Sequence, residues 1–271
     1  MELVDIGANL THRDFRLDLP AVLERARAAG VMQVIVTGTS EAESRRAQAL
    51  TERYPGLLFS TAGVHPHDAA GWSLGTLRAI EELASMPGTV ALGETGLDFY
   101  RDYSPRPLQE KVYEAQLELA ADRDLPVFLH ERGAHRRFVQ ILARYRDRLS
   151  RAVVHCFTGT RDELWAYLDL DLHVGMTGWI CDERRGLHLR ELVPDVPAGR
   201  LMLETDSPYL LPRTLAPVSA NRRNEPAYLT ATLAAVASAL GQEPADVAAA
   251  TTRTARTFFN LPDPGEASLD R

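Results

Sequence analysis

Acidic and imidazole side chains recur in this sequence at or shortly after the ends of short apolar runs. The side chains in question are Asp5, His65, His67, Glu94, Asp98, His130, Glu131, His155 and Asp206. Carboxylates buried beside imidazoles are costly unless a cation neutralises them. A divalent metal ion explains the set economically, and its predicted ligands are Glu94, His130, His155 and Asp206. Mixed imidazole and carboxylate ligands suit zinc, manganese or iron, whereas an oxygen-rich shell suits magnesium.

The apolar runs themselves predict eight β-strands. They span Leu3–Ile6, Gln33–Thr37, Leu57–Ala62, Val90–Gly93, Val127–Leu129, Ala152–Val154, Leu172–Met176 and Leu201–Leu203. Between and after them, apolar residues repeat at helical spacing. The predicted helices are Leu19–Ala29, Glu41–Tyr54, Leu74–Met86, Gln109–Asp124, Ala134–Leu149, Asp162–Leu168, Leu187–Leu192, Ala227–Leu240 and Pro244–Phe259.

Alternating strands and helices predict an α/β fold with a parallel sheet, and eight such units in 271 residues favour a (β/α)8 TIM barrel. An open doubly wound sheet would place a glycine-rich phosphate turn after its first strand, and Gly7-Ala8-Asn9 does not fit that pattern. In a barrel the carboxyl ends of the strands meet at one mouth, so the polar side chains should converge there. We expect one catalytic domain over residues 1–261 and a frayed tail over residues 262–271.

The composition narrows the class of protein. With 30 Lys and Arg against 37 Asp and Glu, the net charge is −7, which argues against a protein that coats DNA by bulk charge. The two cysteines, Cys156 and Cys181, are too few for a disulfide framework, and we expect both to be reduced. No signal-peptide pattern opens the chain and no apolar run approaches the ~18 residues of a membrane span. We therefore expect a cytoplasmic protein without a membrane partner.

Several stretches of the chain carry a family pattern. They read DIGANLT (5–11), TAGVHPH (61–67), GETGLD (93–98), HCFTG (155–159), GWICDERRG (178–186), ETDSPYLLP (204–212) and RRNEP (222–226). Together they cover essentially the whole chain, and GETGLD with ETDSPYLLP is the most specific pair. The chain resembles the TatD family of metal-dependent deoxyribonucleases, which are amidohydrolase-like barrels. GWICDERRG and RRNEP are similar to the TatD subgroup proper.

The resemblance implies a 3′-to-5′ exonuclease that hydrolyses phosphodiester bonds of single-stranded DNA and RNA, in DNA repair or in clearance of DNA fragments. It implies Mg²⁺ as the usual ion, with Mn²⁺ or Zn²⁺ as alternatives, one or two ions in all, and no organic cofactor. By matching motif, Glu94 would be a bridging metal ligand, and His130 and His155 would be further ligands. Asp206 would bind metal or the attacking water, and His65 would contact the scissile phosphate. We expect a monomer.

The first strand departs from the wider family, which commonly supplies two histidines there in the pattern Asp-x-His-x-His. This sequence has Gly7 and Asn9 at those places. Glycine cannot ligate, and asparagine offers only a carbonyl oxygen. The loss of two nitrogen ligands shifts the expected preference toward the harder ions Mg²⁺ and Mn²⁺. The TatD subgroup resembles this chain in the substitution, which we interpret as a feature of the subgroup.

Hydrolysis of a phosphodiester also needs groups that handle protons and hold the substrate. Asp206 is the predicted acceptor of the water proton, and Asp98 and Glu131 are predicted to hold imidazoles. The predicted substrate-binding residues are His65, His67, Arg184, Arg185, Arg222 and Arg223, with Arg213 beside them. The aromatic candidates for stacking on bases are Phe99, Tyr100, Trp179 and Tyr209.

Two other functions stay open at this point. The same metal shell could hydrolyse a different bond, as an aminoacyl-tRNA ester deacylase or a cyclic amidohydrolase does. The chain could instead be a non-catalytic scaffold that binds nucleic acid or protein. The intact set of Glu94, His130, His155 and Asp206 speaks against a scaffold.

Overall fold

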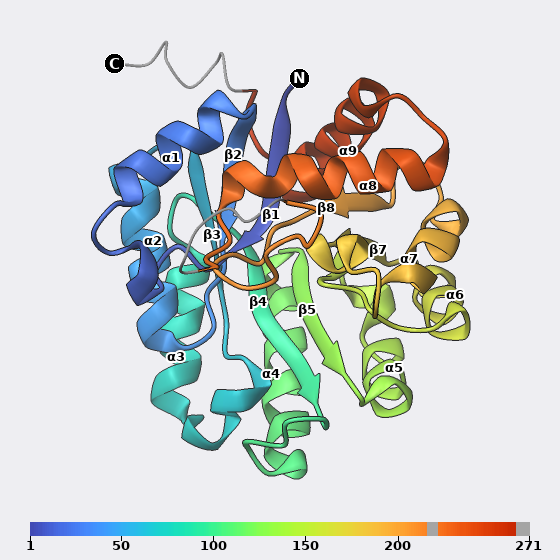
Figure 1. Ribbon diagram of the computed structural model, residues 1–271. Coiled ribbons are helices and arrows are strands. Elements are labelled where there is room, and N and C mark those ends of the chain that lie inside the picture. Colours follow the sequence, from blue (N-terminus) through green and yellow to red (C-terminus); the bar gives the residue numbers. More distant parts are fainter. Residues whose placement is uncertain (216–221, 264–271) are drawn as a thin grey trace. The chain divides into compact units, whose positions relative to one another are not determined.

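The computed structural model describes residues 1–215 and 222–263 (Figure 1). Eight parallel strands follow one another in the sheet in the order of the sequence. They are β1 (Leu3–Ala8), β2 (Val31–Val36), β3 (Leu58–Ala62), β4 (Thr89–Asp98), β5 (Val127–Arg132), β6 (Ala152–Val154), β7 (His173–Met176) and β8 (Leu201–Leu203). A parallel bridge between Ala8 and Ser207 returns the chain to its first strand after the last one. The α/β class and the (β/α)8 barrel topology predicted from the sequence are confirmed.

Helices follow the strands as the periodicity predicts. They are α1 (Leu19–Ala28), α2 (Glu41–Arg53), α3 (Leu74–Ala84), α4 (Arg106–Arg123), α5 (His135–Ala143), α6 (Arg161–Asp169), α7 (Leu187–Leu192), α8 (Leu229–Leu240) and α9 (Pro244–Phe259). One prediction was wrong, because the helix expected over Ala134–Leu149 ends at Ala143. The amides of Arg144 and Tyr145 bond to carbonyls three residues earlier, which tightens the last turn and ends the helix.

The chain divides into two compact units. Unit 1 comprises residues 1–36, 156–164 and 174–271, of which residues 216–221 and 264–271 are not described. Unit 2 comprises residues 37–155 and 165–173. The single catalytic domain expected over residues 1–261 stays a prediction, and most of the tail expected over residues 262–271 lies outside the described residues.

Strand β4 in unit 2 is longer than the predicted strand Val90–Gly93. Figure 1 shows β4 and β5 side by side, and their ladder continues through the pairs Gly96↔His130 and Asp98↔Arg132. Gly96 permits this approach, because its φ is +145° and a Cβ there would lie 1.9 Å from the carbonyl oxygen of His130. Glu94, Asp98 and His130 therefore lie on paired strands, whereas the sequence placed them in loops after the strands.

Each unit has its own apolar core. In unit 2 the buried ring of Tyr113 on α4 stacks on Phe138 of α5, with centroids 5.2 Å apart. In unit 1 the adjacent rings of Phe258 and Phe259 at the end of α9 are both buried. Cys181 is buried and Cys156 is partly buried. Within residues 1–215 and 222–263, no helix combines the length and the apolar character that crossing a membrane requires.

Candidate metal centre

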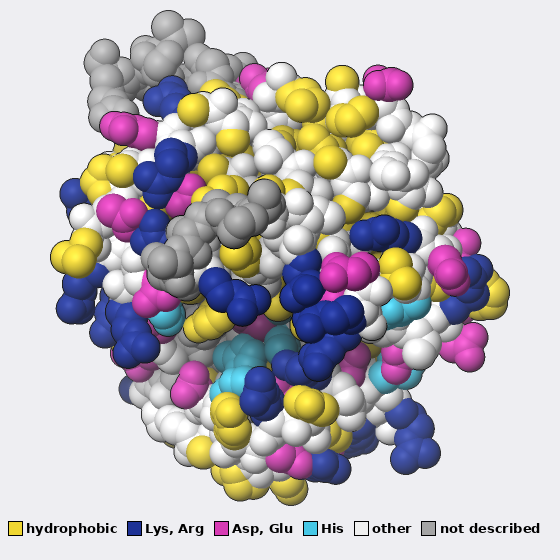
Figure 2. Space-filling model, in the orientation of Figure 1, with side chains coloured by type: hydrophobic (Ala, Val, Ile, Leu, Met, Phe, Trp, Pro, Cys, Tyr) yellow, Lys and Arg dark blue, Asp and Glu magenta, His cyan; other side chains and the backbone are white. Residues whose placement is uncertain are grey.

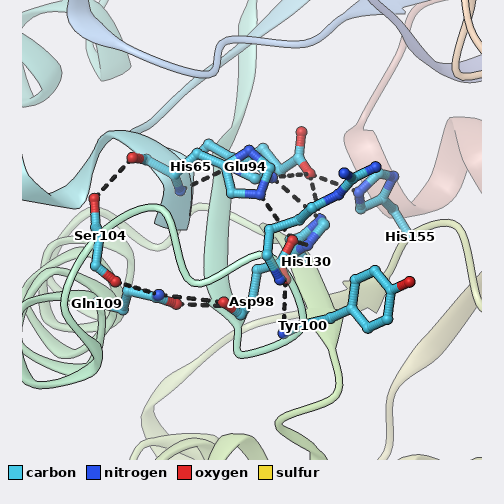
Figure 3. A network of polar contacts seen from close by, with 10 residues as sticks. His65, Glu94, Asp98, Tyr100, Ser104, Gln109, His130 and His155 are labelled. Atoms are coloured by element: carbon cyan, nitrogen blue, oxygen red, sulfur yellow. Dashed lines mark hydrogen bonds and ion pairs between the residues drawn. The ribbon is translucent and has the colours of Figure 1, made fainter.

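Three histidine side chains of unit 2 converge on one carboxylate oxygen, Oε1 of Glu94 (Figure 3). The ring nitrogens His155 Nε2 and His130 Nδ1 lie 2.7 Å and 2.8 Å from it, and His65 Nε2 lies 3.3 Å from it. His65 Nε2 and His130 Nδ1 are also 3.3 Å apart. These residues come from β4, from β5 and from the segments that follow β3 and β6. The structure thus brings together His65, Glu94, His130 and His155, as the sequence predicts.

The donor set fits a divalent cation. Protein ligands bind zinc at about 2.0–2.2 Å, so ligand atoms around one ion lie roughly 3 Å apart. The atoms of His65, Glu94 and His130 have this spacing and form a group able to hold a metal ion. In addition, His130 Nε2 is buried and makes no hydrogen bond among the described residues, although Asp98 Oδ2 lies 3.4 Å away.

The carboxylate and the imidazoles of this cluster shift one another's pKa values. Burial alone would raise the pKa of the Glu94 carboxyl, but the surrounding imidazoles of His155, His65 and His130 hold that pKa well below its ordinary value. Burial lowers the pKa of His130, but the nearby carboxylates of Asp98 and Glu94 outweigh it and raise the pKa above the ordinary value. Both shifts favour a negative Glu94 carboxylate with a positive charge beside it. A bound cation can take over that role.

His65 differs from His130, because burial lowers the pKa of its imidazole to about 4. Its Nδ1 accepts a hydrogen bond of 3.0 Å from the backbone N–H of His67, so the proton of the neutral ring belongs on Nε2. At neutral pH His65 therefore offers one N–H donor and no positive charge. The phosphate contact predicted for His65 would therefore be that of an N–H donor.

Asp98 joins His67 to the cluster. His67 Nε2 donates to Asp98 Oδ2 at 2.8 Å, and Asp98 Oδ1 accepts from the backbone N–H groups of Tyr100 and Arg101 at 3.0 Å and 2.8 Å. Burial opposes ionisation of Asp98, but His130 and His67 lower the pKa of this carboxyl far below its ordinary value. The carboxylate therefore stays charged, fixes the position of the His67 imidazole and lies 3.4 Å from His130 Nε2. The role predicted for Asp98 agrees with this contact.

Part of the cluster reaches the molecular surface. The side chain of His67 is 31% exposed and that of His130 is 17% exposed. Figure 2 shows histidine side chains gathered at one place on the face drawn. A substrate phosphate can therefore approach the imidazoles from solvent.

Two glutamines of α4, which sequence analysis missed, hold the strand ends. Gln116 accepts from the N–H of Val64 at 2.8 Å and donates to the carbonyl of Val64 and to Thr95 Oγ1 at 3.0 Å and 2.6 Å. Gln109 accepts from the N–H of Asp98 at 2.9 Å and donates to the carbonyls of Asp98 and Ser104. Both glutamines are buried, and their spacing of seven residues places them on one face of the helix.

Asp206, the remaining predicted ligand, lies in unit 1 directly after β8. Its N–H donates to the carbonyl of Gly7 at 2.8 Å, and its Oδ1 accepts from Asn9 Nδ2 at 3.0 Å. The backbone of Asp206 is left-handed, with φ at +53°, a conformation that aspartate tolerates better than most residues. Asn9 therefore holds the Asp206 carboxylate.

A buried carboxylate, Asp5, also supports this turn. Asp5 Oδ1 accepts from the backbone N–H groups of Gly7 and Thr205, and Asp5 Oδ2 accepts from the hydroxyl of Thr205 at 2.5 Å. Burial raises the pKa of Asp5 to about 7, against the lowering effect of these hydrogen bonds. Glu204 is also buried and accepts from the backbone N–H of Cys156. Sequence analysis assigned neither residue a role.

The arginines predicted to bind substrate also lie in unit 1, and they fall into two kinds. Arg223 is paired, since it donates to both carboxylate oxygens of Asp18 at 2.8 Å and 2.7 Å and to the carbonyl of Asp14. Arg184 and Arg213 contact the acidic side chains of Asp182 and Glu183. Arg185 and Arg222 are exposed.

The remaining predicted residues occupy varied surroundings. Among the stacking candidates, Tyr100 and Tyr209 are exposed, whereas Phe99 and Trp179 are half-buried. Glu131, which was predicted to hold an imidazole, bonds to other groups. It accepts from the backbone N–H of Ala134 at 2.6 Å and from the hydroxyl of Tyr167 at 2.9 Å.

Comparison with known proteins shows which family the chain belongs to. The model of the TatD-related DNases matches residues 4–260. The chain belongs to the TatD-related DNase family. Membership agrees with the resemblance found in the sequence motifs, and the family and the donor set together indicate a divalent metal site.

Individual relatives of the TatD-related DNase family agree over most of the chain. A protein of Pantoea vagans named 3′-5′ ssDNA/RNA exonuclease TatD is 51% identical over 96% of this chain and 100% of its own length. A protein of the same name from Escherichia fergusonii is 49% identical over 96% of this chain and 99% of its own. The solved structure of YjjV, a TatD homologue from Escherichia coli K12, superposes with a TM-score of 0.88 at 29% identity, over 96% of this chain and 98% of that one.

Proposed function

We propose that this protein is a divalent-metal-dependent 3′-to-5′ exonuclease that hydrolyses phosphodiester bonds of single-stranded DNA and RNA. One observation carries the proposal: Glu94 Oε1 collects three imidazole nitrogens within 3.3 Å, in a chain of the TatD-related DNase family. Relatives at 49–51% identity that bear the name of 3′-5′ ssDNA/RNA exonuclease support the choice of bond and of polarity.

The proposed ligands are Glu94, His130, His155 and Asp206, and the proposed ion is Mg²⁺, with Mn²⁺ or Zn²⁺ as its competitors. When bound, such an ion acidifies a water molecule and polarises a phosphoryl oxygen. We assign to Asp206 the acceptance of the proton from the attacking water, on the strength of its sequence motif. The proposal also makes Glu94 a bridging metal ligand. It sets the number of bound ions at one or two.

His65 and His67 are proposed to receive the scissile phosphate. The neutral ring of His65 has its Nε2 proton as a donor, and His67 is held by Asp98 with part of its side chain open to solvent. The positions of both rings are fixed before substrate arrives, which reduces the cost of orienting them in the reaction. Exposed Arg185 and Arg222 are proposed to contact phosphates further along the strand.

The decisive experiment follows the fate of a labelled single strand. Purified protein is incubated with oligonucleotides labelled at the 3′ end or at the 5′ end, after chelation and then with Mg²⁺, Mn²⁺ or Zn²⁺ added back. We expect the 3′ label to be released at once as mononucleotide. The 5′-labelled strand should become shorter stepwise, and the chelated sample should show no reaction.

Matched controls make the outcome clear. Glu94→Gln should be inert, whereas Glu131→Gln should be active, because Glu131 bonds to Tyr167 and to the Ala134 amide. Activity that survives chelation, or equal activity of Glu94→Gln and the parent protein, contradicts the proposal. Release of amino acid from an aminoacyl-tRNA, or opening of a cyclic amide, without nucleotide release would replace it by the alternative hydrolase function. A cytoplasmic location, a monomeric state and a role in DNA repair or fragment clearance stay predictions.

A further inference from the structure

The loop that joins β4 to α4 in unit 2 presents two tyrosine rings to solvent beside the histidine cluster. Tyr100 is 68% exposed and Tyr103 is 66% exposed. An exposed aromatic side chain is by itself ordinary. These two are of interest because of what fixes them and what surrounds them. We propose that Tyr100 and Tyr103 form a stacking subsite for unpaired nucleobases next to the bond that is cut. The inference rests on the proposed nuclease function and deepens it.

The loop is fastened to the same residues that hold the imidazoles. The backbone N–H of Tyr100 donates to Asp98 Oδ1, while Asp98 Oδ2 accepts from His67. At the other end of the loop, the Ser104 hydroxyl donates to the carbonyl of His67 at 2.7 Å, and Gln109 donates to the carbonyl of Ser104 at 2.8 Å. Figure 3 shows Asp98, Tyr100, Ser104 and Gln109 in this one network. The loop that carries the tyrosines is therefore held at both ends against the cluster.

The second ring makes direct contact with the cluster. The centroid of Tyr103 lies 4.7 Å from that of His67, and His67 lies 4.2 Å from His65. Rings at these separations are in van der Waals contact. A base laid against Tyr103 would thus have its phosphate close to the imidazoles that are proposed to receive it.

The surrounding charge suits a nucleic acid. The guanidinium carbon of Arg132 lies 4.4 Å from the centroid of the Tyr100 ring, and that of Arg101 lies 5.9 Å from it. Both arginines are exposed. A base can stack on an aromatic ring or on a guanidinium plane, and the positive charges attract its phosphates. Such a subsite accepts any base but requires that the base be unpaired, which agrees with a preference for single strands.

A binding experiment tests the subsite without relying on hydrolysis. The protein carries Glu94→Gln to prevent cleavage, and the probe is a single-stranded oligonucleotide with 2-aminopurine at its 3′ end, whose fluorescence falls when the base stacks. We expect quenching with this protein and about a tenfold loss of affinity when Tyr100→Ala and Tyr103→Ala are added. Restoring aromatic rings, as Tyr100→Trp and Tyr103→Phe, should recover affinity and quenching. Equal affinity and quenching with and without the tyrosine rings overturns the inference.

Steady-state kinetics separates base stacking from damage to the site. In the active protein, Tyr100→Ala with Tyr103→Ala should raise KM by about tenfold on an ordinary strand. The loss should shrink to less than about threefold when the terminal nucleotides are abasic, since no base remains to stack. An equal loss on both substrates refutes base stacking. A protein that stacks the probe but cleaves no strand instead disproves the proposed function and leaves the subsite standing.

A matched control exists in the same unit. Tyr54 at the end of α2 also has an arginine over its ring, with Arg53 at 5.3 Å from the centroid. Tyr54 lies before the amino end of β3, whereas the cluster lies at the carboxyl ends of the strands. Tyr54→Ala should leave affinity and KM within about twofold of the parent, because it removes the same Tyr–Arg pairing away from the cluster. A loss equal to that of the loop tyrosines would also contradict the inference.

Discussion

Buried carboxylates are compensated differently in the two units of this protein. In unit 2, Glu94 is surrounded by three imidazoles, and Asp98 holds a fourth. In unit 1, Asp5 is satisfied by two backbone N–H groups and one hydroxyl. Imidazoles can release a proton and bind a cation in its place, whereas backbone amides cannot. The comparison teaches that a site for an ion is recognised by the chemistry of its donors rather than by burial of charge.

The largest effects should come from replacing either of the two proposed acidic ligands, Glu94 of unit 2 or Asp206 of unit 1. Glu94→Gln should abolish tight binding of the divalent ion and reduce kcat by about 10³-fold. Asp206→Asn should reduce kcat by at least about 100-fold and still retain an ion, because the imidazole cluster is intact. Elemental analysis of the dialysed variants and initial rates on labelled single strands measure the two quantities. An ion lost from Asp206→Asn but retained by Glu94→Gln would invert the assigned roles.

The next effect is the contribution of Asp5 to the free energy of unfolding, which does not involve the proposed metal ligands. Its folded-state pKa of about 7 lies above the ~3.9 of an unfolded aspartate. Between these values the folded state binds the additional proton, so the contribution to stability is complete below about pH 4 and is lost as the pH rises to about 7. The loss amounts to roughly 3–4 kcal/mol over the window. Urea unfolding at pH 5 and pH 7.5 should show that the free energy of unfolding decreases less with rising pH in Asp5→Asn than in the parent protein.

The control for this measurement is Asp14→Asn, because Asp14 is exposed and its replacement should leave the pH dependence of the parent unchanged. A decrease in Asp5→Asn as steep as in the parent protein would mean that Asp5 does not carry a proton in the folded state.

A somewhat smaller effect is expected for Asp98, which fixes imidazoles without being a proposed ligand. Asp98→Asn should weaken metal affinity or activity by about 10–100-fold, because the amide no longer holds the proton of His67 or balances the charge of His130. Activity against metal concentration gives both quantities. Asp102→Asn, an exposed carboxylate paired with Arg106 in the same loop, should change them by less than about twofold. Similar losses in the two variants would assign the effect to the loop as a whole.

The smallest effects distinguish the two adjacent arginines of unit 1. Arg223→Ala should lower the free energy of unfolding by about 1–3 kcal/mol, because it leaves the carboxylate of Asp18 without its bidentate partner. Arg222→Ala should leave stability unchanged and weaken binding of single strands a few-fold, with a salt slope reduced by about 0.7. Urea unfolding and anisotropy at several salt concentrations test this. A binding defect in Arg223→Ala without a stability loss would restore it as a substrate contact.

The sequence predicts most of the fold because its signals are local. Each of the eight strands is an apolar run between turns, and all eight are present within a few residues of their predicted bounds, apart from the ends of β4 and β5. Those ends were placed too early, since Glu94 and Asp98 look like loop residues. They stay in the ladder because Gln109 and Gln116 satisfy the polar groups of the neighbouring segments, and such contacts are not visible in a periodicity.

The candidate site was predictable where several histidines shared one pattern and not where a partner was distant. Glu94, His130 and His155 were predicted as ligands of one metal site and His65 as a phosphate contact beside it, and these four residues lie together. Asp206, the fourth predicted ligand, stays a prediction. The ion pair of Arg223 with Asp18 spans 205 residues, and nothing near either residue announces it. The glutamines of α4 did leave a signal, namely two polar side chains seven positions apart within the apolar face of a helix.

The continued β4–β5 ladder has a consequence for how an ion is captured. Glu94 and His130 are borne by paired, buried backbone, and their ring and carboxylate contacts are already formed. An arriving cation therefore need not freeze a loop, and little conformational entropy is lost on binding. Its affinity should vary little with temperature-induced loosening of the surface segments. Slow exchange of the amide protons of β4, with or without metal, would be the visible sign of a site that is rigid before it is filled.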